Sequence, residues 1–119
     1  MYIRTMFNKE LLKGTLSALI LKLLADGGKM YGYEMAQRVR EQSGNKILLK
    51  DGSLYPALQK MSDDGLVTFR EETVSGRLRK YYYLTPKGKA QSALALKELE
   101  EFIATISQVA FPKTKIKTT

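Results

Sequence analysis

The chain contains 119 residues, of which 20 are Lys or Arg and 12 are Asp or Glu, and its formal net charge is +8. This length fits one compact domain with an appended element, and 44% apolar with 27% charged residues is typical of a globular chain. The chain has no His and no Cys, which excludes Ser–His–Asp triads, zinc sites and disulfides. Enzymes built on carboxylates, Lys or Tyr remain open, and no cofactor or metal is expected.

The N-terminal segment lacks the continuous apolar stretch and the small-residue cleavage site of a signal peptide. The most apolar window, residues 16–25, is interrupted by Lys22 and is shorter than the roughly 18 to 20 apolar residues that span a bilayer. We therefore expect a cytoplasmic protein without a transmembrane helix.

Three helices are predicted in the first half of the chain. The first begins with Asn8 as its cap, ends at residues 26–28, and carries an apolar stripe of Leu16, Leu19, Ile20, Leu23 and Leu24. The second covers residues 31–43 and ends at Gly44. The third has Ser53 as its N-cap and runs to about Asp64.

A hairpin and a long helix are predicted in the second half. Residues 67–72 and 78–85 are rich in β-branched and aromatic types, and residues 73–76 between them form a loop. Thr85 followed by Pro86 then opens a helix that runs through about Ala110.

Three helices followed by a hairpin are the element order of a winged helix-turn-helix, in which the third helix enters the major groove of DNA. The predicted fold is therefore α+β and mainly α, with a long C-terminal dimerisation helix. We expect residues 1–85 to form the DNA-binding domain, residues 86–112 the dimerisation helix, and residues 113–119 a flexible basic tail.

The third helix combines an apolar face with a polar one. Leu54, Leu58 and Met61 share one side, whereas the opposite side carries Tyr55, Pro56, Gln59 and Lys60. The positive end of the helix dipole and the hydroxyls of Ser53 and Tyr55 suit contact with phosphates or base edges. The alternative is an ordinary capped surface helix.

The predicted hairpin carries much of the positive charge. Residues 70–89 include six basic side chains and two acidic ones, a local charge of +4. Gly76 and Arg77 at the tip suit the minor groove or a phosphate, and Arg79 and Lys80 suit the sugar-phosphate backbone. The alternative is a solvated basic edge that discourages aggregation. Within the tyrosine run at 81–83, alternation places at least one ring in the core.

The last predicted helix carries a heptad-like apolar seam. A helix that protrudes with such a face predicts self-association, although it could instead fold back on its own domain. The expected dimer interface consists of Leu96, Leu99, Phe102, Ile103, Ile106, Val109 and Ala110.

Enzyme motifs are incomplete. Residues 43–46 match S-x-x-K without the accompanying motifs of penicillin-recognising enzymes, and neither Gly-Lys pair completes a phosphate-binding loop.

Four runs together resemble the signature blocks of PadR-type transcriptional regulators: YGYE at 31–34, GSLYPAL at 52–58, DGLV at 64–67 and RKYYYLTPKG at 79–88. The resemblance implies a dimeric winged-helix repressor of a palindromic operator, with the C-terminal helix forming most of the dimer interface. It places on DNA-contacting positions Tyr31, Tyr33, Ser53, Tyr55, Pro56, Lys60, Gly76 and Arg77.

The single C-terminal helix is similar to that of the compact subfamily, some members of which bind flat hydrophobic drugs between two tryptophans at the dimer centre. This chain has no Trp, which leaves Phe102 as a weaker aromatic substitute for binding a small hydrophobic or aromatic effector. The leading hypothesis is a homodimeric, sequence-specific DNA-binding repressor without enzymatic activity. The alternative is a ligand-sensing or protein-interaction module with an incidental basic wing.

Overall fold

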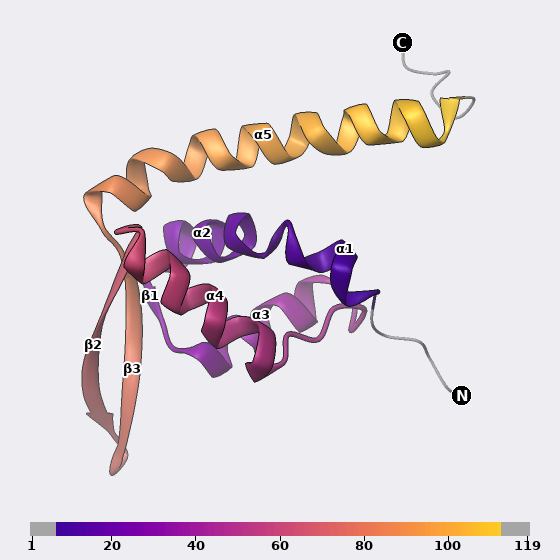
Figure 1. Ribbon diagram of the computed structural model, residues 1–119. Helices are drawn as coiled ribbons and strands as arrows, with labels where there is room; N and C mark the ends of the chain where they lie inside the picture. The colour runs from indigo at the N-terminus through magenta and orange to yellow at the C-terminus, as the bar shows by residue number, and fades with distance from the viewer. Residues whose placement is uncertain (1–6, 113–119) are drawn as a thin grey trace, which may run out of the picture.

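The computed structural model of the chain describes residues 7–112, which form a winged helix-turn-helix with a long C-terminal helix (Figure 1). The mainly helical fold class is confirmed, and the basic tail predicted at 113–119 lies outside the described residues. In chain order the elements are α1 (Lys9–Lys13), α2 (Leu16–Gly27), β1 (Lys29–Met30), α3 (Gly32–Gln42), α4 (Asp51–Asp63), β2 (Val67–Val74), β3 (Arg77–Leu84) and α5 (Pro86–Ala110).

The N-terminal helix predicted as one element is two. The Asn8 side chain caps α1 by accepting a hydrogen bond from the Glu10 backbone N–H, as expected from its position. α1 nevertheless ends at Lys13 with Gly14 as its C-cap, and the Thr15 hydroxyl donates to the Leu12 carbonyl at 2.9 Å. This side-chain hydrogen bond engages a carbonyl at the end of α1, and α2 then begins at Leu16.

The third predicted helix begins earlier than the sequence indicated. Lys50 is the N-cap residue of α4, and its carbonyl accepts hydrogen bonds from the backbone N–H groups of Ser53 and Leu54. Ser53 therefore lies inside the first turn, and its predicted role as N-cap is wrong. Asp51 supplies a negative charge in that turn, which the positive end of the helix dipole favours.

The hairpin is tighter than predicted and belongs to a larger sheet. Ser75 and Gly76 both have positive φ, as a two-residue hairpin turn requires, so β2 extends to Val74 and β3 begins at Arg77. A strand that the sequence did not predict, β1, pairs antiparallel with β3 through Lys29 and Met30. The sheet order is β1-β3-β2.

One core holds α2, α3 and α4 against the inner face of the sheet. The side chains of Ile20, Met35, Leu54 and Leu58 are 0–1% exposed. The remaining buried members of the core are Leu16, Leu21, Leu23, Leu24, Met30, Val39, Leu49, Met61, Val67, Tyr82 and Leu84. The predicted apolar face of α4 is thus confirmed as its buried face.

α5 starts at a tightly fitted junction. The Thr85 hydroxyl accepts from the Gly88 N–H at 3.0 Å, and Pro86 follows in the first helical position, as predicted. Gly88 is buried, and a Cβ there would collide with the Leu66 carbonyl oxygen. α5 first packs along α2 and then projects beyond it (Figure 1). None of the helices within residues 7–112 is long and apolar enough to cross a membrane.

Gly88→Ala is expected to lower the free energy of unfolding by about 1–3 kcal/mol, because the added methyl group overpacks against backbone. Gly14→Ala is the control, since the space around Gly14 is open and its φ is −72°. Urea unfolding at equal protein concentration measures both variants. Equal stability of the two would contradict the tight junction.

Candidate nucleic-acid interface

α4 presents a polar face to solvent. Its exposed residues include Pro56, Gln59 and Lys60, while Ser53 is half-buried near the N-terminal end. The Gln59 amide donates to the Asp63 carboxylate at 2.9 Å, and the Lys60 ammonium lies 3.2 Å from the Asp64 carboxylate. The acidic residues at the end of α4 therefore hold two of the predicted DNA-contacting side chains along the helix.

Tyr55 is turned partly back toward the domain. Its side chain is 42% exposed, yet a Cβ at Gly32 would collide with its hydroxyl, so the ring lies against the start of α3. Burial, with a smaller contribution from Asp51, raises the pKa of Tyr55 above its ordinary value. Tyr55 thus links the outer face of α4 to α3, and Gly32 provides the space for this contact.

The hairpin of β2 and β3 is the wing of the fold, and its register separates its basic side chains. Cross-strand partners share a face, and successive residues alternate between faces. Arg79 is the cross-strand partner of Glu72 and lies on the outer face of the sheet. Lys80 is the partner of Glu71 on the inner face, and its ammonium lies 4.5 Å from the centre of the Phe69 ring. The structure therefore does not bring Arg79 and Lys80 together. Gly76 and Arg77 are exposed at the tip, as expected.

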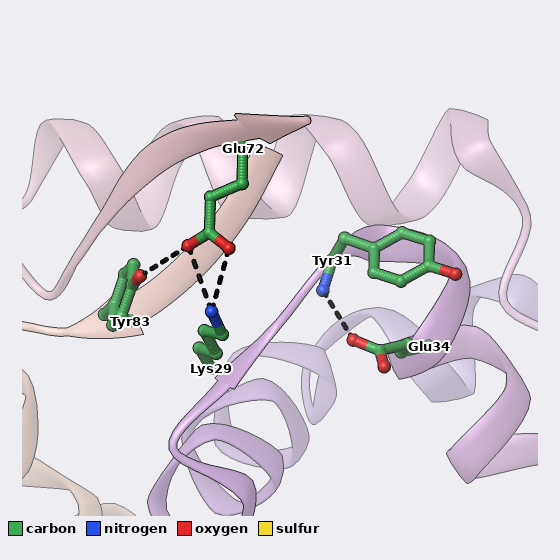
Figure 2. A network of polar contacts seen from close by, with 5 residues as sticks. All are labelled: Lys29, Tyr31, Glu34, Glu72 and Tyr83. Atoms are coloured by element: carbon green, nitrogen blue, oxygen red, sulfur yellow. Dashed lines mark hydrogen bonds and ion pairs between the residues drawn. The ribbon is translucent and has the colours of Figure 1, made fainter. Parts of the chain in front are cut away.

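The start of α3 joins this outer face. The Tyr31 ring stacks with Tyr33 at a centroid distance of 6.3 Å and meets the Tyr81 ring edge-on at 5.4 Å. The Arg79 guanidinium lies 4.4 Å from the centre of the Tyr31 ring, a cation–π distance. The Tyr31 backbone N–H donates to the Glu34 carboxylate (Figure 2). Tyr31 and Tyr33, predicted on the second helix, and Arg79, predicted on the hairpin, thus form one cluster.

A polar network that the sequence did not predict crosses the outer face. The Lys29 ammonium lies 2.9 and 3.0 Å from the two carboxylate oxygens of Glu72, and the Tyr83 hydroxyl donates to the same carboxylate at 3.2 Å (Figure 2). Residues 29 and 72 are 43 positions apart, and no local pattern connects them. Of the tyrosine run, Tyr81 and Tyr82 are buried, as the alternation argument predicted for at least one ring.

Comparison with known proteins identifies the family. The signature described as "Transcriptional regulator PadR-like family" matches residues 20–94. The chain belongs to the PadR-like family. It is therefore a transcriptional regulator rather than an enzyme, and regulators of this family bind DNA.

Individual relatives agree with the family. The negative transcriptional regulator PadR of Bacillus subtilis is 36% identical over 73 residues, which cover 60% of this chain and 40% of that protein. An uncharacterised protein of Lysinibacillus sphaericus is 29% identical over 97 residues, 81% of this chain and 88% of the relative. The crystal structure of a PadR-like transcriptional regulator from Bacillus cereus superposes with a TM-score of 0.71 at 27% identity, covering 87% of this chain and 98% of that one.

The distal half of α5 is exposed in this PadR-like regulator. Leu96 and Leu99 are half-buried, whereas Phe102, Ile103 and Ile106 are exposed and continue the same apolar seam. Val109 and Ala110 at its end are exposed as well. The protomer thus leaves uncovered the distal part of the seam that the sequence assigned to dimerisation, residues 102–110. Within residues 7–112, no group of three or more acidic residues is arranged to hold a metal ion.

Proposed function

We propose that the chain is a homodimeric repressor that binds a palindromic operator, with residues up to Thr85 contacting DNA and α5 joining the protomers. The observation that carries the proposal is that the outer face of α4, the start of α3 and the wing are left exposed by one core. Two-fold DNA readers present two recognition helices about one duplex turn apart, which requires a dimer. Such a repressor acts in the cytoplasm, on the chromosome.

A gel shift across genomic fragments, including the promoter of the chain's own gene, tests sequence-specific binding. The proposal predicts a saturable shift that resists competitor DNA at moderate salt and weakens steeply as salt rises, because phosphate contacts release counterions. Absence of any competitor-resistant complex would leave the alternative, a module whose long helix docks another ligand or protein.

Two substitutions on α4 separate base reading from phosphate contact. Tyr55→Ala is expected to weaken operator binding by about 1–3 kcal/mol and to blur the preference at its half-site position. Lys60→Ala is expected to weaken binding to all sequences similarly and to lower the salt slope by about 1, because the single contact with Asp64 leaves the Lys60 side chain 77% exposed and open to a phosphate. Binding titrations on operator and random duplexes measure both, with thermal unfolding as the control for folding. Equal losses on both duplexes for both variants would contradict these roles.

Dimerisation through α5 is tested by Ile103→Asp, which places a charge in the exposed apolar seam. The variant is expected to sediment as a 13.5 kDa monomer, because a buried unpaired carboxylate is unfavourable at the interface. Ala104→Asp is the matched control: it adds the same charge one residue away at an exposed position outside the seam, and it should remain dimeric. A persistent Ile103→Asp dimer would refute this interface.

A small hydrophobic or aromatic effector is a further part of the proposal. Phe102 is exposed on the seam, where pairing of two α5 helices would bring aromatic side chains near the dimer centre. An aromatic ligand that releases the operator should then lose its effect in Phe102→Ala.

A further inference from the structure

One acidic side chain lies among the cations on the outer face of the sheet. Arg79 is the cross-strand partner of Glu72, and Arg70, two residues before Glu72 on β2, shares its face. Lys29 reaches Glu72 from β1, across the central strand β3, as Figure 2 shows. Glu72 is therefore surrounded by three basic residues on a face otherwise suited to a polyanion.

Lys29 and Glu72 form a salt bridge. The ammonium meets both carboxylate oxygens, and the Tyr83 hydroxyl donates a further hydrogen bond to the carboxylate. The hydrogen bond from Lys29 is the main cause that lowers the pKa of Glu72, and the same bond raises the pKa of Lys29. Both groups are thus charged near neutral pH. Lys29 also lies 4.7 Å from the centre of the Tyr81 ring, which orients its side chain along the sheet.

The ammonium of Lys29 lies beside the predicted DNA contacts. Because it meets the carboxylate of Glu72, it lies near the row of the sheet that contains Arg79. Arg79 in turn stacks on Tyr31 at the start of α3. The side chain of Lys29 remains 45% exposed, so a phosphate that approaches Tyr31 and Arg79 would come within reach of its ammonium.

We propose that Glu72 is an internal counterion that holds Lys29 away from DNA phosphates and thereby limits the affinity of the wing for any duplex. A phosphate can use Lys29 only by displacing the carboxylate or by lying next to it, and both are unfavourable. Since a phosphate contact carries no sequence information, Glu72 lowers binding to specific and random DNA alike. This inference rests on the proposed DNA-binding face.

Glu72→Gln on a random-sequence duplex tests the inference, with Glu71→Gln as the matched control. Both variants remove one negative charge from neighbouring positions of β2, but Glu71 faces the opposite side of the sheet, beside Lys80. Glu72→Gln is expected to tighten binding by about three- to tenfold and to steepen the slope of log K against log salt by about 0.9, the value of one phosphate contact. Glu71→Gln should leave that slope unchanged.

A double-mutant cycle with Lys29→Gln identifies the cation involved. In the otherwise unchanged chain, Lys29→Gln should change the slope of log K against log salt by much less than the roughly 0.9 of one phosphate contact, because the ammonium is already paired with Glu72. In the Glu72→Gln background, the same change should abolish the gain. This first arm needs only the single Lys29 variant, so it remains informative if Glu72→Gln impairs folding, which thermal unfolding would reveal.

Three results would overturn the inference. Equal slopes of log K against log salt for the Glu72 and Glu71 variants would mean that only the net charge matters. A gain in affinity that survives Lys29→Gln would exclude Lys29 as the cation that contacts the phosphate. Weaker binding by a folded Glu72→Gln variant would make the pair a brace of the sheet instead. These measurements use random DNA, so failure of this inference can be told apart from failure of the proposed function. The proposed function fails if the unchanged chain forms no competitor-resistant complex.

Discussion

The burial of Leu54 and Leu58 sets the rotation of α4 about its axis, and the exposed face of the molecule depends on that rotation. Both side chains are at most 1% exposed, and Met61 one turn later is 2% exposed. Turning the helix by one residue, about 100°, would bring them toward water at about 1.5–3 kcal/mol each. Burial of the opposite face of α4 therefore turns Pro56 and Gln59 toward solvent.

A second constraint is the register of the hairpin. The two-residue turn at Ser75 and Gly76 fixes which residues of β2 and β3 face each other, and a shift by one residue would exchange the two faces. With this register, Arg79 stacks on Tyr31 and is the cross-strand partner of Glu72, while Lys80 lies on the other side of the sheet. The wing is thus divided into two faces of different composition. Its outer face combines stacked rings and cations with one carboxylate.

Most of the fold could be predicted because its signals are local. The apolar periodicity and the cap at Thr85 required only nearby residues and located α5 correctly. The apolar stripe at residues 16–24 found α2 but not the break that separates it from α1. β1 could not be found because two residues carry no periodicity. The start of α4 was misplaced because its N-cap residue, Lys50, makes no side-chain capping hydrogen bond and so leaves no capping signal in the sequence.

The site was predicted less completely than the fold, because its contacts join distant segments. Lys29 meets Glu72, and Tyr55 fits against Gly32, only once the sheet and helices are assembled.

An amide NMR titration of the regulator with a duplex from its own promoter tests the proposed DNA-binding face most directly. If DNA binds the outer face of α4, the start of α3 and the wing, the shifts will be grouped at residues 31–33, 51–60 and 76–80. Shifts confined to the distal half of α5 would contradict it.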